Sequence, residues 1–263
     1  VVGYKPTYGR VSTGGVIPLA PSLDHVGWFT QDVSGSALAA AVLCSNWSAA
    51  PATGRPILGI PKGPYLQHAD DEARRAVETA AEDLRLQGYE VRRVDLFPDF
   101  EEIARRHRLI LAAEAARVHA EWFRLYGSLY HEKTADLIRA GQAVDEADLA
   151  AAQAARNKLQ EFMGDLMQSE SIDGWLAPAA VGAAPRGLES TGDPVMSLPW
   201  THIGFPAIAL PFAVSASGLP IGIQLVAGHG ADERLLVWAA EIERHLSSDR
   251  TPAMRHTAAG SAA

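Results

Sequence analysis

ILGIPKGPYLQHADDEARRAVETAAEDLRLQGYEVRRVDL, residues 57–96, contains a strand, a helix and a second strand in succession. Residues 57–60 are a short apolar run that ends at Pro61, as expected of a buried strand. Across residues 70–87 apolar side chains recur every three or four positions, with Asp70 placed to cap the start of a helix and Gly88 to end it. Residues 90–96 then alternate apolar and charged side chains. This succession predicts a βαβ unit, so at least part of the sheet is parallel.

Periodic patterns continue on both sides of this unit. Helices are predicted at residues 32–43, 99–126, 131–139, 145–169 and 231–246, and a brief strand at 175–177. Residues 207–214 and 220–227 are apolar on successive positions, which predicts two central strands covered on both faces. The elements together predict an α/β fold with a mixed, largely buried β-sheet flanked by helices. No linker divides residues 1–263, so we expect one domain that ends in a flexible tail at 251–263.

Composition and charge exclude several classes of protein. The 263 residues are 48% hydrophobic and 21% charged, as in ordinary globular domains. The net charge of -8, without a run of lysine or arginine, argues against nucleic acid or an anionic membrane as a partner. No stretch approaches the roughly 18 apolar residues of a membrane span, and the first residues lack a signal-peptide pattern, so we expect a cytoplasmic protein. Cys44 is the only cysteine, which excludes a disulfide framework.

Three blocks of sequence resemble one enzyme family. They read GYKPTYGRVSTGGVIPLAPSLDHVG at residues 3–27, PWTHIGFPAIALP at 199–211, and GLPIGIQLV at 218–226, which leads to DERLL at 232–236. Their motifs, order and separation resemble the amidase signature family of serine amidohydrolases. Residues 99–169 resemble that family only in being helical, and this is the region in which such enzymes differ in substrate pocket.

The resemblance implies a reaction and also a gap. Members of this family hydrolyse carboxylic amides through an acyl-serine intermediate, without a metal or organic cofactor. Their nucleophilic serine, a second serine in a cis peptide bond and a lysine stand upstream of the first block, whereas this sequence opens at Val1. We therefore assign no catalytic residue to this chain, and we expect the N-terminal part of the fold to be missing. The complete form would act on a small-molecule amide, and the chain as given is predicted to be inactive alone.

The first block supplies residues with expected structural roles. In the family motif the lysine equivalent to Lys5 follows the catalytic serines and is not the base, so we expect Lys5 to support the fold. Arg10 and Asp24 are expected to pair and hold this ribbon beneath the active site. Gly9 and Gly27 are expected at turn positions that need a fixed or positive φ.

The C-terminal blocks supply one candidate for substrate contact. By resemblance, the passage after residue 199 lies near the substrate pocket, so Trp200 is either a wall of that pocket or a buried aromatic anchor. His202 is expected to be a core histidine rather than a base. Gln224 lies in an apolar strand and needs hydrogen-bond partners if it is buried, which makes it a support residue first and a substrate contact second.

No metal site is predicted. His107, Glu114 and Glu121 follow one another at heptad spacing on a predicted helix. Seven helical residues rise about 10.5 Å, which is too far for ligands of one ion. We expect instead a polar helix face with ion pairs to neighbouring arginines, namely Arg105, Arg108, Arg117 and Arg124.

Two other functions stay open from the sequence. A catalytically degenerate family member could act as a binding or scaffold protein, with a possible homodimer formed through exposed sheet surface. An amidotransferase subunit that acts on charged transfer RNA is the alternative within the enzyme class. Residues 18–27 look more like those of general amidases, and the acidic composition disfavours a large RNA partner.

Overall fold

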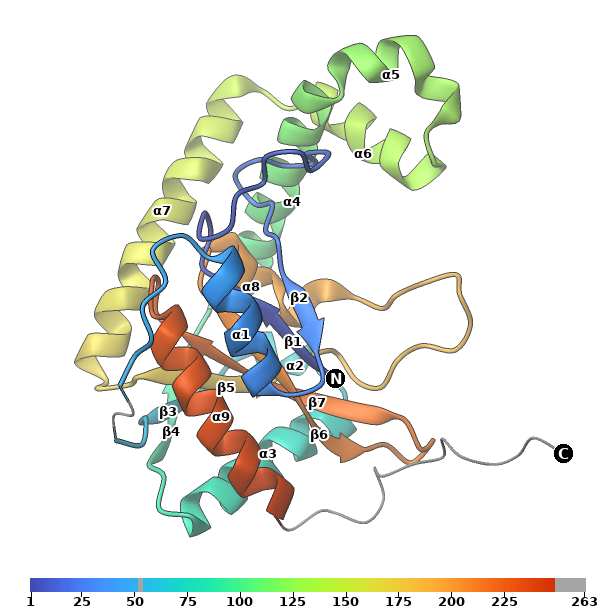
Figure 1. The fold of residues 1–263 in the computed structure, drawn as a ribbon. Coiled ribbons are helices and arrows are strands. Elements are labelled where there is room, and N and C mark those ends of the chain that lie inside the picture. The colour runs from blue at the N-terminus through green and yellow to red at the C-terminus, as the bar shows by residue number, and fades with distance from the viewer. Residues whose placement is uncertain (52–53, 249–263) are drawn as a thin grey trace, which may run out of the picture.

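The computed structural model describes residues 1–51 and 54–248 and contains a mixed seven-stranded sheet (Figure 1). The predicted tail at 251–263 lies outside the described residues. The strand order is β2-β1-β6-β7-β5-β3-β4. The strands comprise β1 Val2–Lys5, β2 Trp28–Thr30, β3 Leu58–Lys62, β4 Val91–Asp95, β5 Gly174–Pro178, β6 Ala207–Val214 and β7 Pro220–Ala227.

The predicted βαβ unit is confirmed. β3 and β4 pair in parallel and are joined through α2 (Pro64–Gln67) and α3 (Asp71–Leu86). The side chain of Asp70 caps α3 by accepting a hydrogen bond from the backbone N–H of Ala73 at 2.7 Å. Gly88 follows the helix with a φ of 85°, a conformation that glycine adopts without the steric cost of a Cβ atom. Local sequence thus determines both ends of the helix as well as its type.

The prediction for the two apolar strands is half right. β6 and β7 form an antiparallel hairpin, and residues 223–227 of β7 are all buried, as expected of a central strand. In β6, by contrast, burial alternates, and Val214 is 52% exposed. No described helix covers the outer face of β6, so its small side chains, such as Ala207 and Ala209, border a groove.

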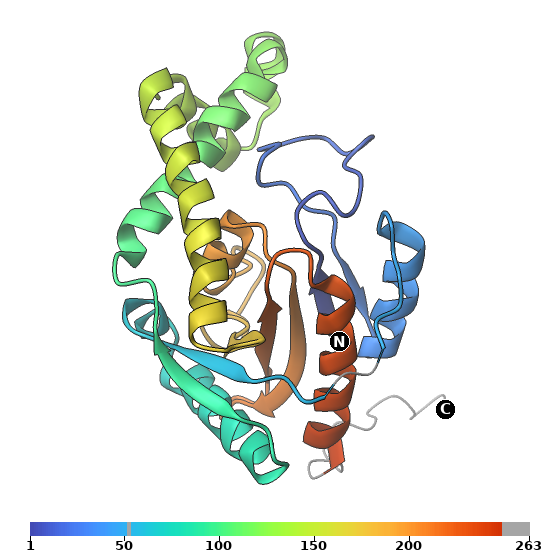
Figure 2. The ribbon, with the colours of Figure 1, turned by 90° about the vertical axis from the view of Figure 1, so that its left-hand side faces the viewer.

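Helices cover the other face of the sheet and extend beyond one end of it. α3 packs on β5 and β7, α9 (Asp232–Ser248) packs on β6 and β7, and α1 (Val33–Leu43) packs against α9. The helical arm consists of α4 Phe100–Val118, α5 Ala120–Tyr126, the 3-10 turn Gly127–Leu129, α6 Glu132–Gln142 and α7 Glu146–Ser169. Figures 1 and 2 show α4 and α7 side by side, with α5 and α6 at the far end.

One helical prediction needed correction. The single helix predicted for 99–126 is divided at His119, whose ring bonds the Tyr130 hydroxyl at 2.9 Å and the Pro18 carbonyl at 3.0 Å. Those long-range contacts hold the break and are not visible in local periodicity. Further along the chain, a 3-10 turn (Pro194–Met196) leads into α8 (Leu198–His202). No helix in the described residues has the length and apolarity to cross a membrane.

Candidate functional site

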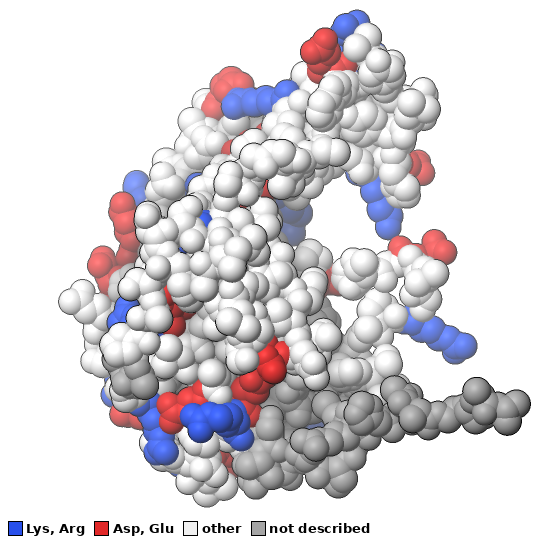
Figure 3. All heavy atoms as spheres, viewed as in Figure 1, with Lys and Arg blue, Asp and Glu red and all other residues white. Residues whose placement is uncertain are grey.

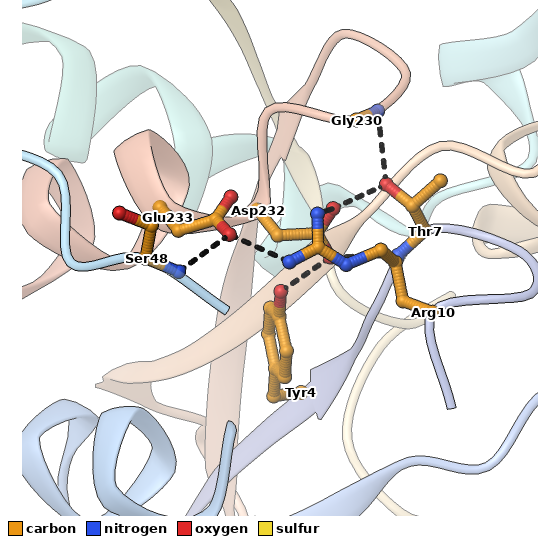
Figure 4. A network of polar contacts seen from close by, with 7 residues as sticks. All are labelled: Tyr4, Thr7, Arg10, Ser48, Gly230, Asp232 and Glu233. Carbon is orange, nitrogen blue, oxygen red and sulfur yellow. Dashed lines mark hydrogen bonds and ion pairs between the residues drawn. The ribbon is translucent and has the colours of Figure 1, made fainter. Parts of the chain in front are cut away.

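A buried carboxylate joins the two ends of the described chain. Asp232, at the start of α9, has no exposed surface and accepts hydrogen bonds from the Tyr4 hydroxyl at 2.8 Å and the Thr7 backbone N–H at 2.8 Å. The Thr7 hydroxyl donates to the second carboxylate oxygen at 2.5 Å and accepts from the Gly230 N–H at 3.0 Å (Figure 4). The first and last of the sequence blocks are thus fastened to each other in the core, so both contribute to one site.

Arg10 belongs to this cluster and does not pair with Asp24, so that prediction was wrong. Its guanidinium donates to the Glu233 carboxylate at 2.6 Å and lies 3.9 Å from Asp232. Asp24 instead accepts the backbone N–H groups of Leu19, at 2.9 Å, and Ala20, at 3.1 Å. Both residues stabilise the loop after β1, but each does so through its own partners.

Lys5 anchors the end of β1. Its ammonium group donates a hydrogen bond to the Phe205 backbone carbonyl, in the turn that precedes β6. Desolvation of the partly buried amine lowers its pKa from 10.5 to about 7, against the opposing charge of Asp232. The hydrogen bond ties β1 to the start of β6, and in the described residues no serine is hydrogen-bonded to this amine. A supporting role for Lys5 stays a prediction from the sequence.

The two glycines singled out in the first block are required for different reasons. Gly9 has a φ of 80°, as a turn requires. Gly27 does not have a positive φ. A Cβ atom on Gly27 would lie 2.6 Å from the Tyr4 carbonyl oxygen, so close approach of two backbones explains it, and the turn explanation is wrong for this residue.

The open face of the sheet forms an apolar groove of about 400 Å³, here called the sheet groove. β1, β2, β6 and β7 contribute its walls, together with residues of α8. Lys5, Trp200 and Gln224 all line it, so the structure brings together three residues that the sequence had singled out. Arg10 and Asp24 do not line it.

Trp200 is a fully buried anchor that also forms part of the groove lining. Its indole N–H donates to the Tyr65 hydroxyl at 3.1 Å, and the Tyr65 hydroxyl donates to the Met196 carbonyl at 2.7 Å. Gln224 donates to the carbonyls of Pro178 at 2.7 Å and Met196 at 2.9 Å. These bonds satisfy polar groups that would otherwise destabilise an apolar interior, and they fix α8 against the sheet.

A second cavity, of about 140 Å³, is lined mainly by polar side chains and is here called the Arg156 cavity. The side chain of Arg156 reaches it from the middle of α7. The remaining lining residues come from the loop after β1, from α7, from the end of α8 and the passage to β6, and from the loop before α9. They are Tyr8, Ser22, Gln160, His202, Ile203, Gly204 and His229. Of these residues, only His202 was singled out from the sequence.

Arg156 is held in place from one side only. It donates to the Ser22 carbonyl at 2.8 Å and to the Ser22 hydroxyl at 3.0 Å, through the same terminal nitrogen. Glu114 fixes Ser22 from the opposite side, because it accepts the Ser22 hydroxyl at 2.7 Å and the Ser22 backbone N–H at 2.9 Å. No carboxylate of the described residues forms an ion pair with Arg156. Its other N–H groups are therefore available to a ligand that accepts hydrogen bonds.

The sequence predicted that His107, Glu114 and Glu121 form a polar helix face with ion pairs to arginines. For Glu114 and His107 this prediction was wrong. Glu114 is 8% exposed and bonds Ser22 and Gln153 rather than an arginine. His107 lies beside His202 with ring centroids 5.5 Å apart. The exposed part of the face does form ion pairs, for example Arg105 with Glu102. Tertiary contacts, with Ser22 for Glu114 and with His202 for His107, remove these two residues from the solvated face.

The histidines near Arg156 are held neutral. Desolvation, together with neighbouring positive charge that includes Arg156, lowers the pKa of His202 to about 3 and that of His107 to about 4. The Nδ1 atoms of both rings are buried without a hydrogen-bond partner in the described part of the chain. Since neutral imidazoles add no charge, Arg156 is the principal source of positive charge at the cavity. The described residues contain no cluster of three or more histidine, cysteine, aspartate or glutamate side chains that could hold a metal ion.

Charged side chains form no extended basic surface on the face seen in Figure 3. Lysine and arginine are scattered there among acidic residues, with a broad uncharged area between them. That distribution agrees with the net charge of -8 and gives nucleic acid no continuous basic track on this face.

Comparison with known proteins identifies relatives that match most of the chain. The model of the amidase family matches residues 1–236. Two relatives are the A subunits of glutamyl-tRNA(Gln) amidotransferases. That of Geobacter sp. (strain M21) is 29% identical over 92% of this chain, and that of Wolbachia sp. subsp. Brugia malayi (strain TRS) is 31% identical over 94%. A crystal structure of an amidase superposes with a TM-score of 0.82 and 28% identity, covering 94% of this chain and 58% of that one. The chain spans 59% of the length of both curated relatives.

Proposed function

We propose that this chain, which belongs to the amidase family, forms the substrate-binding part of a hydrolase that cleaves carboxylic amide C–N bonds. The complete form would act through an acyl-serine intermediate, without a metal or organic cofactor. The observation that carries the proposal is the Arg156 cavity, where an unpaired guanidinium lies among neutral histidines in a fold shared with amidases. A chain of residues 1–263 made alone is expected to show no turnover of simple amides.

The cavity also suggests the class of amide. Arg156 offers charge-assisted N–H donors, which favour a carboxylate or a second carbonyl group on the substrate. The volume of about 140 Å³ admits only a compact polar group there. Glu114 and Ser22 fix the arginine before a ligand arrives, which lowers the entropic cost of binding. We therefore propose a small amide that carries an acidic or carbonyl group away from the scissile bond.

Substrate contact by Trp200 stays part of the proposal. Its complete burial and its bond to Tyr65 support an anchoring role, and its place in the lining supports contact with an apolar part of the substrate. The sheet groove would then receive that part or be covered by further residues of the family fold. A cytoplasmic location and a homodimer also remain predictions from the sequence.

The test compares two amides of similar size in the full polypeptide that the gene encodes. Succinamate carries a carboxylate where butyramide carries a methyl group. Arg156→Gln is expected to lower kcat/KM for succinamate about 10- to 100-fold, equivalent to about 1.4 to 2.7 kcal/mol, with little change for butyramide. Arg108→Gln is the matched control, because Arg108 is exposed on α4 and does not line the cavity. Equal losses of kcat/KM for both amides would contradict the proposed substrate class. No turnover of any amide would contradict the proposed hydrolase activity.

The amidotransferase alternative is favoured by the identity of the curated relatives. It predicts glutamine hydrolysis that rises when charged transfer RNA and partner proteins are present. The acidic net charge of -8 weighs against a large RNA contact by this chain itself. A scaffold function predicts instead that the full polypeptide hydrolyses neither glutamine nor simple amides.

A further inference from the structure

We propose that a separate cavity between α7 and α9 is a binding site for a small monocarboxylate with an apolar body. This α7–α9 cavity has a volume of about 510 Å³, within the range usual for small-molecule sites. The C-terminal half of α7, the loop before α9 and the first two turns of α9 form its walls. The proposal goes beyond the proposed function and does not depend on amide hydrolysis.

Two hydrogen-bond donors at the α9 side lack acceptors. Trp238 is 5% exposed, and its indole N–H has no partner in the described part of the chain. The guanidinium of Arg234 lies over the Trp238 ring, 5.7 Å from the ring centre, and forms no ion pair with a described carboxylate. A carboxylate satisfies the Arg234 guanidinium, whereas an ammonium group does not.

The acidic residue of this cavity already has a partner. Asp173 accepts the backbone N–H of Ile57 at 2.8 Å and so helps to hold the start of β3. His229, also in the lining, has a lowered pKa because of desolvation, so it adds no charge at neutral pH. Arg234 is therefore the cation that would meet a ligand here.

The rest of the lining suits an apolar body. Met167, Ile172 and Phe205 are each at most 7% exposed and line the cavity. Gly164 lies in the interior of α7, where glycine is less favourable than alanine. A Cβ atom on Gly164 would meet no heavy atom within 4 Å, so packing against a neighbour does not explain this glycine. It leaves the side of the helix open toward the cavity.

The α7–α9 cavity and the Arg156 cavity are neighbours with different cations. Gln160 and His229 line both of them, but Arg156 lines only the one and Arg234 only the other. Gln160 is fixed by a bond to the Ile203 carbonyl at 3.0 Å. Substitution of either arginine thus distinguishes the two cavities.

The test uses phenylacetate as the probe and isothermal titration of the 263-residue chain. 2-Phenylethanol and phenethylammonium are matched probes without the carboxylate. Phenylacetate is expected to bind, and both matched probes are expected to bind at least tenfold more weakly. Arg234→Gln and Gly164→Leu are expected to weaken phenylacetate binding at least tenfold, the first by removing the cation and the second by filling the cavity. Arg108→Gln, which lies outside both cavities, and Arg156→Gln, which lies in the other cavity, are the controls and should leave it unchanged.

Three results would overturn the proposal. They are no binding of phenylacetate, unchanged binding in Arg234→Gln, or a loss confined to Arg156→Gln, which would assign the probe to the Arg156 cavity. Circular dichroism of each variant shows whether it has folded. Because Arg234 is exposed on α9, its substitution is decisive even if Gly164→Leu does not fold.

Discussion

The Tyr4 hydroxyl donates a hydrogen bond 2.8 Å long to the buried carboxylate of Asp232, 228 residues further along the chain. The bond links β1 to the start of α9, and Thr7 adds two more donors to the same carboxylate. Such a carboxylate is stable in the core only while its hydrogen-bond donors are present. The end of β1 and the loop that carries Ser22 are consequently held in register with the C-terminal strands.

Asp232→Ala is therefore expected to be strongly destabilising. It leaves Tyr4 and Thr7 with buried donors unpaired, at a cost of about 3 to 5 kcal/mol. Tyr4→Phe removes one donor and leaves Asp232 bonded to Thr7, so about 1 to 2 kcal/mol is expected. Urea unfolding of the two variants checks the order. If Asp232→Ala lowers the free energy of unfolding no more than Tyr4→Phe does, the carboxylate is not the centre of the cluster.

Two helical glycines should respond in opposite directions to alanine. In α6, a Cβ atom on Gly141 would lie 1.8 Å from the Ala112 carbonyl oxygen of α4, so Gly141→Ala must push the two helices apart. A loss of about 3 kcal/mol is expected. In α7, Gly164 has open space, so Gly164→Ala is expected to stabilise the protein by about 0.5 to 1 kcal/mol. Thermal melts of both variants compare them directly, and destabilisation by Gly164→Ala would contradict the open side of α7.

Elements with local signals could be predicted from the sequence. The βαβ unit has its own period, cap and terminating glycine, so its residues alone specified it. The open face of β6 could not be predicted in this way, because burial depends on what covers the sheet and the strand itself is apolar throughout. The partner of Arg10 was missed for a related reason, since Glu233 is 223 residues away.

The polar cavity had a signal that was overlooked. Gln153, Arg156 and Gln160 fall on one face of α7 at spacings of three and four residues, in a stretch otherwise rich in alanine. Such a stripe on a helix that packs inward predicts buried polar partners. Glu114 on α4 supplies one of them by accepting a hydrogen bond from Gln153 at 3.1 Å. Only the tertiary packing of α4 on α7 shows that Glu114 faces this stripe.

Acid should destabilise the fold well before the carboxylates titrate. In the folded state the pKa of His25 and that of His107 are about 4, and that of His202 is about 3, all lowered chiefly by desolvation from the ordinary 6.5. Below pH 6.5 the unfolded chain therefore binds more protons than the folded one, and stability falls as the pH drops toward 4. Each histidine adds at most about 1.4 kcal/mol per pH unit to that slope.

The contribution of one histidine can be isolated by substitution. The ring of His202 lies next to His107, and Arg106 and Arg156 also act on it electrostatically. His202→Gln removes its titration and should make the fall in stability between pH 6.5 and pH 4.5 shallower. Urea unfolding at four pH values measures this slope. A slope equal to that of the unsubstituted protein would mean that His202 is protonated in the folded state.

Two substitutions of Trp200 distinguish an anchoring role from a role in substrate binding. Trp200→Ala removes a fully buried indole that contacts Tyr65, Phe97 and Trp175, so a loss of about 3 to 5 kcal/mol is expected. Trp200→Phe keeps most of the ring but loses the bond to the Tyr65 hydroxyl, and about 1 to 2 kcal/mol is expected. Urea unfolding of both variants, with Tyr65→Phe as the matched control for the hydrogen bond, tests the anchor.

The folded variant, Trp200→Phe, then tests the groove. If Trp200 contacts substrate, kcat/KM of the full polypeptide should change its ranking of small against aromatic amides, by about 1 to 3 kcal/mol in differential transition-state binding. Tyr65→Phe, which does not line the sheet groove, should leave that ranking unchanged. If Trp200→Phe lowers kcat/KM equally for every amide, Trp200 has only a structural role, because a residue that only supports α8 affects all substrates alike.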